Sequence, residues 1–280
     1  MHAPRDFTFP PELLDELIDH LDGTSTLISC GLISKRALVK TRRRLFSTLE
    51  FTLDEVFDRF LDLAGAPWTS FTSAVQEIHL QDLFLQYYDY GNARDAKTVA
   101  SNLCNVKTLS IFVHLCRFGG GTLPRSILDI VCELKIHDLQ LDGVGMTTTE
   151  EMVILFSRLS PTLKTLAFRA VRAYAVEDLH LLRHLSIFRR PLHFRILDNL
   201  SLTTFLKDVL DPTANPGLDV TVHTFHIRES IFLGDNTLTW RFLEHIGRGV
   251  EQLVISFTLP SRIASPGKLP LVCQIRHLSK

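Results

Sequence analysis

The chain begins with a helical stripe of apolar residues. Five of them recur at the three- and four-residue spacing that places side chains on one helix face: Leu13, Leu14, Leu17, Ile18 and Leu21. Pro10 and Pro11 precede the stripe and suit the first turn of a helix, where a missing N–H costs nothing. Asp22 and Gly23 predict the end of this helix.

Two more short helices are predicted before residue 50. The second carries four apolar residues, which are Leu27, Ile28, Leu32 and Ile33. The third is expected from about Ser34 to Phe46. Three helices of this length bury only a small shared core, so we expect the unit to lean on a partner or on the rest of the chain.

The other face of the third helix is basic. Its cations are Lys35, Arg36, Lys40, Arg42, Arg43 and Arg44. A nucleic-acid patch is one interpretation, but no aromatic residue interleaves with these cations for base stacking. The acidic first helix is also expected to lie nearby and to cancel part of their field. A solvated face is therefore favoured, and no nucleic-acid partner is expected.

The same segment carries a resemblance. Phe9–Leu21, followed by Cys30–Ala37 and Arg44–Phe46, resembles an F-box. The version to which it is most similar is common in fungal proteins, where a Pro-Pro-Glu-Leu-Leu opening precedes a Leu-Val-Ser-Lys/Arg segment. This chain departs from the family at Ala37, where the family usually has tryptophan, and the departure weakens the expected packing.

The resemblance implies that residues 1–50 bind the Skp1 linker of a cullin-based ubiquitin ligase. The residues that it implies for the contact surface and for the unit's own core are Phe9, Pro10, Leu13, Leu14, Leu17, Ile18, Leu32 and Ile33. The sequence does not divide these two roles. An ordinary amphipathic helix that leads a larger fold is the alternative.

A second pattern, apolar-x-x-apolar-x-apolar, returns along the remaining chain. It occurs at Val75/Ile78/Leu80, Val106/Leu109/Ile111, Ile136/Leu139/Leu141, Leu163/Leu166/Phe168, Leu182/Leu185/Ile187, Val222/Phe225/Ile227 and Val250/Leu253/Ile255. Four of the six intervals between the central residues are 27 to 31 residues, which is typical of a repeat architecture. Helical patterns fill most of the intervals, and strands that alternate with helices predict a parallel α/β sheet.

The repeated pattern resembles leucine-rich repeats. We therefore expect an α/β fold with a helical F-box-like module at 1–50, a connector at 51–74 and an irregular leucine-rich-repeat domain at 75–280. Three positions past each motif the family prefers Asn or Cys, whereas this chain has Leu83, His114, Val144, Val171, Arg190, Ser230 and Thr258. We expect irregular turns where those side chains are missing. A non-repetitive α/β domain remains the alternative, and the end of the sequence soon after the seventh motif is consistent with an incomplete array.

Strand alternation assigns the faces of such a sheet. The apolar positions point into the core, and their neighbours line the open concave face. The neighbours predicted to hold a protein substrate are Glu77, His79, Phe112, Asp142, Arg169, Phe188, His226 and Arg228. This face changes from acidic to basic along the chain.

Composition narrows the class of protein. With 45% hydrophobic and 22% charged residues and a net charge of -1, the chain is an ordinary globular protein without a strong field of either sign. No apolar stretch approaches the roughly 20 residues that span a bilayer, and the N-terminus is unlike a signal peptide. Its five cysteines form no C-x-x-C pair. We expect no membrane partner and a reducing compartment, cytoplasm or nucleus.

Motifs for chemistry are not found. The sequence has no G-x-S-x-G elbow and no phosphate-binding loop. The pairs His180/His184 and His223/His226 have spacings seen in metal sites, but scattered surface histidines account for them better. We therefore expect a non-enzymatic adaptor with no catalytic residue, no metal and no cofactor. Its rivals are a repeat-based scaffold that no longer binds Skp1 and an enzyme with an unrecognised α/β site.

Overall fold

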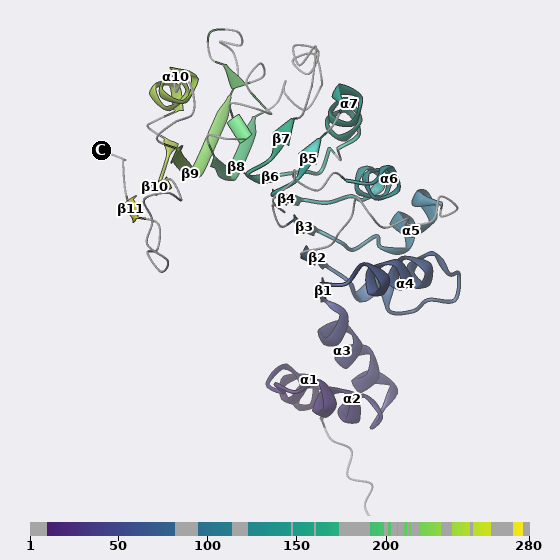
Figure 1. The fold of residues 1–280 in the computed structure, drawn as a ribbon. Coiled ribbons are helices and arrows are strands. Elements are labelled where there is room, and N and C mark those ends of the chain that lie inside the picture. The colour runs from purple at the N-terminus through teal and green to yellow at the C-terminus, as the bar shows by residue number, and fades with distance from the viewer. Residues whose placement is uncertain are drawn as a thin grey trace, which may run out of the picture.

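The fold is seen in a computed structural model (Figure 1). The structure describes residues 10–81, 95–113, 123–146, 148–159, 161–173, 191–198, 201–202, 206, 210–211, 213, 219–230, 237–246, 249–258 and 271–276.

Three short helices form the N-terminal unit, as the sequence predicts. They are α1 (Pro11–Asp19), α2 (Thr24–Gly31) and α3 (Lys35–Phe46). Ser34 caps α3, because its hydroxyl accepts a hydrogen bond of 3.1 Å from the Ala37 N–H. The buried core of the unit consists of Ile18, Leu27, Cys30 and Ala37.

Small residues let α2 and α3 approach closely. A Cβ atom built on Gly31 would lie 2.7 Å from the Thr41 hydroxyl oxygen, which is closer than real contacts allow. The Thr41 hydroxyl is buried and already donates to the Ala37 carbonyl at 2.8 Å. Ala37 itself is fully buried, so this core is built around a small residue.

The rest of the described chain is a mixed α/β structure around one sheet of nine strands. Their order is β1-β2-β3-β4-β6-β8-β9-β10-β11, and every neighbouring pair is parallel except β10 and β11. The strands are β1 (Thr48–Phe51), β2 (Glu77–Gln81), β3 (Thr108–Phe112), β4 (Asp138–Asp142), β6 (Thr165–Arg169), β8 (Leu192–Asp198), β9 (Val220–Ser230), β10 (Gln252–Thr258) and β11 (Leu271–Arg276). A two-stranded sheet pairs β5 (Gly145–Met146) with β7 (Arg172–Ala173).

Helices cover one side of the curved sheet. They are α4 (Asp54–Gly65), α5 (Ala96–Asn102), α6 (Arg125–Glu133), α7 (Thr149–Arg158) and α10 (Thr237–Ile246), with a short 3-10 turn η1 at Thr72–Ala74. Figure 1 shows the strands following an arc with these helices along its outer side. The inner side of the arc over β2 to β6 is left open to solvent.

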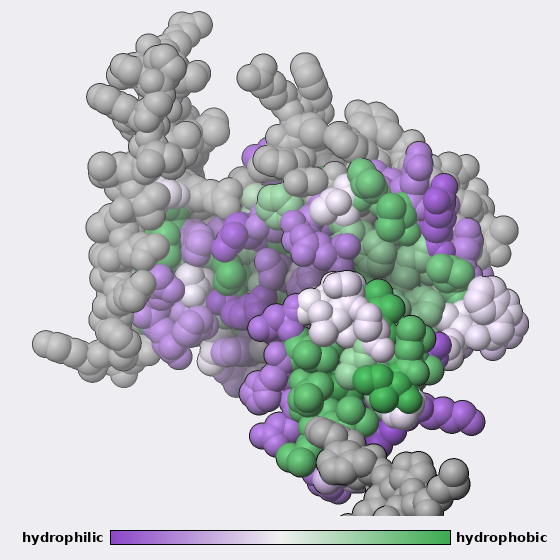
Figure 2. Space-filling model, turned by 90° about the horizontal axis from the view of Figure 1, so that it is seen from below, coloured by the Kyte–Doolittle hydropathy of each residue, from purple (hydrophilic) through white to green (hydrophobic). Residues whose placement is uncertain are grey.

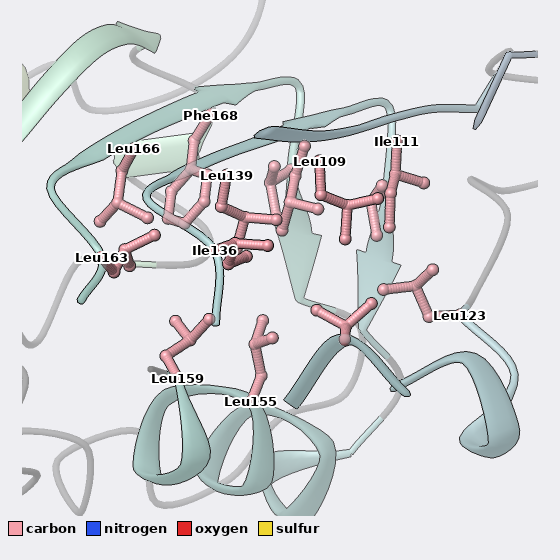
Figure 3. Close-up of a cluster of buried hydrophobic side chains, with 14 of the residues drawn as sticks. Leu109, Ile111, Leu123, Ile136, Leu139, Leu155, Leu159, Leu163, Leu166 and Phe168 are labelled. Carbon is pink, nitrogen blue, oxygen red and sulfur yellow. The ribbon is translucent and has the colours of Figure 1, made fainter. Parts of the chain in front are cut away.

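Alternating side chains build the core between the two layers. Leu109, Leu139 and Leu166 come from neighbouring strands and are all buried. Figure 3 shows Leu155 of α7 and Leu159, which directly follows the helix, pointing toward this row. A fully buried leucine side chain contributes about 1.5–3 kcal/mol, so each member of this row adds to the stability of the sheet.

Residues 48–74 are part of the sheet and its core. The sequence predicts a connector at 51–74, whereas β1 pairs in parallel with β2 and Phe51 is buried. Rings of Phe51 and Phe60 lie 4.9 Å apart, and a second pair, Phe46 of α3 and Phe71, lies 5.2 Å apart. The Phe46–Phe71 pair joins the N-terminal unit to the sheet, and the Phe51–Phe60 pair packs β1 against α4. Aromatic pairs of this kind add about 0.5–1.5 kcal/mol each beyond their burial.

Six of the seven predicted strand motifs fall at described strands of the sheet. The motif at Leu182/Leu185/Ile187 lies outside the described residues. The strand that pairs with β6 is β8, which the pattern did not predict. Its buried residues, Leu192, Phe194 and Leu197, are spaced by two and then three, because a bulge inserts one residue against β6.

The segments that follow β3, β4 and β6 are joined by backbone hydrogen bonds where the structure describes them. The N–H of Val113 bonds the Asp142 carbonyl at 2.8 Å, and the N–H of Gly143 bonds the Arg169 carbonyl at 2.9 Å. Val144 and Val171 are fully buried at the positions where Asn or Cys was expected. Backbone hydrogen bonds therefore hold the turns after β4 and β6 side by side.

One buried carboxylate holds the turn after β6. Ala170 has a φ of 53°, a left-handed conformation that is costly for a residue with a Cβ. Asp198 is fully buried and accepts hydrogen bonds of 2.8 Å from the N–H groups of Ala170 and Ser201. The Ser201 hydroxyl accepts one of 3.0 Å from the Val171 N–H. This network fixes the turn that directly follows Arg169.

Replacing Asp198 tests the network. We expect Asp198→Ala to lower the free energy of unfolding by about 3 kcal/mol or more, because two buried N–H groups lose their acceptor. Asp95→Ala is the matched control, since the exposed Asp95 caps α5 through a hydrogen bond of 3.1 Å to the Lys97 N–H, and caps contribute about 1 kcal/mol. Urea denaturation followed by circular dichroism measures both. Equal losses would contradict this account of the turn.

Candidate functional site

The open face of the sheet carries the residues that the sequence assigned to it over β2 to β6. Strand register aligns His79, Ser110 and Gln140 in one row. A second row lies two residues further along the strands and contains Gln81, Phe112, Asp142 and Arg169. The alternating residues between them are buried on the helix side. The two rows therefore lie side by side on the concave face.

These rows border a shallow hollow of about 320 Å³. It is lined by His79, Leu80, Gln81, Ser110, Phe112, Gln140, Asp142 and Arg169. One aromatic ring lies among amides, a hydroxyl and charged groups. Such a surface can bind a polypeptide by hydrogen bonds and one apolar contact.

The two charged residues that line the hollow, Asp142 and Arg169, form an ion pair with each other. Arg169 donates from Nη1 to Oδ2 of Asp142 at 3.4 Å. The Asp142 side chain is only 9% exposed, so the carboxylate faces the arginine more than solvent. Asp142 was predicted as a contact residue for a substrate. Because its side chain is mostly buried and paired with Arg169, it offers little surface to a substrate.

A residue that the sequence analysis missed reaches the same hollow. Arg195 lies at the bulge of β8, between the partners of Leu166 and Ala167 on β6. Its Nη2 donates to Oε1 of Gln140 on β4 at 2.6 Å, so the side chain crosses β6 above Ala167. Only a small residue at 167 leaves room for this crossing. A bulge follows neither the period-two alternation nor the repeat spacing, so Arg195 could not be found from the pattern.

The other predicted residues of this face are spread more widely. Glu77 begins β2 and lies 3.4 Å from Nε2 of His79 and 3.5 Å from the hydroxyl of Thr48. His226 is half-buried on β9, beyond β8 from the hollow. Arg228 continues β9, but its side chain lies outside the described residues, as does all of Phe188. The structure thus brings four of the eight together: His79, Phe112, Asp142 and Arg169.

The N-terminal unit presents a second surface, which is apolar. Leu32 is 82% exposed and Ile33 is 71% exposed, and they follow directly after α2. Leu13 and Leu17 of α1 are also exposed, as is Pro10. Figure 2 shows apolar side chains gathered over these helices in the view from below.

The structure divides the roles that the sequence left together. Ile18 is fully buried in the core of the unit, and Leu14 packs against that core. Ile18 is therefore a core residue, whereas Leu14 is half-buried and stays partly exposed. Ile28 and Val39 are exposed apolar residues that the sequence analysis did not assign to it. Phe9 lies outside the described residues.

Ion pairs cover much of the basic face of α3. Arg36 bonds Asp15 at 2.6 Å, Lys40 bonds Asp19 at 2.8 Å and Arg44 lies 3.6 Å from Asp22. The hydrogen bond from the Arg36 guanidinium holds the pKa of Asp15 below its usual value. The expected cancellation of the basic field by the first helix is thus present, which disfavours a nucleic-acid patch.

Side-chain arrangements suited to catalysis or metal binding are few in the described part of the chain. There, no three His, Cys, Asp or Glu side chains are placed to hold a metal ion. His223 pairs with Glu251 at 2.8 Å, while His180 and His184 lie outside the described residues. Burial raises the pKa of the Cys132 thiol to about 11, so the thiolate is scarce at neutral pH.

Comparisons with known proteins add no assignment. The sequence matches no protein-family model and no curated protein. None of the described helices is both long and apolar enough to cross a membrane. Any functional conclusion therefore rests on the two surfaces described above.

Aspartate substitutions test the division between core and surface in the N-terminal unit. We expect Ile18→Asp to unfold the three helices, because a charge in this small core has no partner. Leu32→Asp should change the free energy of unfolding by less than about 0.5 kcal/mol, because the side chain is already exposed. Limited proteolysis within residues 10–46 and thermal melting report on both. Similar destabilisation by the two substitutions would contradict the division.

Proposed function

We propose that the chain is a substrate-recognition adaptor of a Skp1-cullin-F-box type ubiquitin ligase. In this proposal the N-terminal helices are an F-box-like module that binds the Skp1-like linker. The curved α/β body is an irregular leucine-rich-repeat domain that binds a protein substrate on its concave face. The chain then acts by holding its substrate near a ubiquitin-loaded enzyme, which requires proximity and orientation but no catalytic side chain.

The observation that carries the proposal is the exposed apolar surface of the N-terminal unit. Leu13, Leu17, Leu32 and Ile33 are exposed although the unit has its own core. A contiguous apolar surface of this kind on a soluble domain marks a protein interface. Burial of each such side chain in a partner is worth about 1.5–3 kcal/mol.

The firm connection between the two surfaces supports the same function. After α3, only Ser47 precedes β1 of the sheet. The Phe46 and Phe71 rings contact each other at an interplanar angle of 42°, and Arg42 donates to the Ser70 hydroxyl at 3.1 Å. A Skp1-like linker protein bound to the helices would therefore have a fixed orientation relative to the concave face, as an adaptor requires.

The curved body has features that support the repeat assignment. Successive strands β2, β3, β4 and β6 pair in register, and the chain returns through α5, α6 and α7 on the same side. The turns after β4 and β6 also pair with each other. Such stacking of one supersecondary unit on the next is the physical basis of repeat proteins.

The position of Ala37 bears on the scaffold alternative. In a scaffold that has lost Skp1 binding, the exchange of tryptophan for Ala37 would have removed part of the docking surface. Ala37 is fully buried between α2 and α3, so the exchange changes the core and leaves the exposed leucines in place. This observation favours retained binding.

Capture of a Skp1-like linker tests the proposal. We expect the full chain to co-purify with it, and the double variant Leu17→Asp/Leu32→Asp to lose the complex, with each lost apolar contact weakening binding by about tenfold or more. Leu63→Asp is the matched control, because Leu63 on α4 is 42% exposed and Leu17 is 44% exposed. The scaffold alternative predicts no capture by the unaltered chain. That result, or equal capture by the double variant, would contradict the proposal.

A further inference from the structure

Arg195 is a cation without a carboxylate partner among the residues that the structure describes. Its side chain is exposed on the concave face, and its recorded contact is the amide oxygen of Gln140 at 2.6 Å. A neutral amide leaves the positive charge uncompensated. The contact does hold the guanidinium at the border of the hollow, because Gln140 lines it.

Neighbouring charges do not cancel that of Arg195. Asp142 is the carboxylate that lines the hollow, and it is mostly buried and bonded to Arg169. Two other carboxylates, Glu77 and Asp138, begin their strands two residues before His79 and Gln140. They lie at the amino ends of β2 and β4, whereas Arg169 lies at the carboxyl end of β6. The hollow is therefore positive beside β6 and β8 and negative beyond its far border.

The remaining lining fits an uncharged stretch of peptide. Gln81, Ser110 and Gln140 offer amide and hydroxyl groups that can bond a peptide backbone. Phe112 offers a half-buried ring to one apolar side chain. A hollow of about 320 Å³ is at the lower end of the range of ligand pockets, which suits a few residues of a chain.

From this arrangement we infer that the hollow binds an acidic peptide segment, with one anionic side chain on Arg195 and an adjacent apolar side chain on Phe112. The inference rests on the proposed function, because it names the class of substrate for the concave face. Arg195 is the specificity-determining residue, and Gln140 positions it. A carboxylate and a phosphate group share the chemistry that a guanidinium recognises.

Selection from a random peptide-display library on the full chain tests the inference. We expect the enriched peptides to carry Asp or Glu next to an apolar residue, and their binding to weaken as salt is raised. Arg195→Glu should weaken binding of the selected peptides about tenfold or more, and the neutral Arg195→Gln should weaken it less. Arg59→Glu is the matched control, because Arg59 is exposed on α4, in the outer layer.

Synthetic versions of one selected peptide show whether Arg195 prefers a carboxylate or a phosphate group. Replacement of its acidic residue by phosphoserine distinguishes a phosphorylated substrate from a carboxylate, according to which binds more tightly. Replacement by lysine should abolish binding. Enrichment of neutral or basic peptides, no enrichment at all, or equal binding by Arg195→Glu and the unaltered chain would overturn the inference.

Capture of the Skp1-like linker by the same preparations separates the two proposals. Arg195→Glu should still capture the linker, which also shows that the variant is folded. Leu17→Asp/Leu32→Asp should lose the linker but still bind the selected peptides. Loss of linker capture alone thus opposes the adaptor function, whereas failure of charge selection opposes only the role of Arg195.

Discussion

Parallel pairing of short strands is the constraint on which the rest of the structure depends. Each strand from β2 to β6 must bury alternate side chains beneath the helix layer, and the chain returns through a helix on that same side. The other face is then left open by necessity. Because the strands pair in register, its side chains form rows across several strands. Residues about thirty apart in sequence thus line one hollow, as Phe112 and Asp142 do.

The same sheet also fixes the N-terminal unit. Its three helices share a core of four buried residues, too few for an independent domain of ordinary stability. The unit gains support where α3 meets β1 and the rings of Phe46 and Phe71 pack. Leu32 and Ile33 are exposed to solvent. Packing to the sheet and exposure of an apolar surface are thus separate features of one small unit, as a docking module requires.

Much of the fold was predictable because periodicity reports which side chains are buried. The apolar spacing located α1 and the strands β2, β3, β4 and β6, and it placed His79 and Arg169 on the open face. It did not locate β8, because the bulge at Arg195 breaks the spacing on which the pattern depends. It also could not separate Leu17 from Ile18, since adjacent residues of a stripe differ in burial only once the neighbouring helix is in place. Asp198 gave no signal, because its partners are backbone N–H groups distant in sequence.

Hydrogen exchange of the full chain with and without the Skp1-like linker tests most directly whether one body carries two separate surfaces. The account predicts that the linker slows exchange of backbone N–H groups in α1 and α2 and at Leu32 and Ile33. Exchange in β2, β3, β4 and β6 should not change, because the concave face remains free for a substrate. Unchanged exchange in the N-terminal helices, or slowed exchange in those strands, would contradict the account.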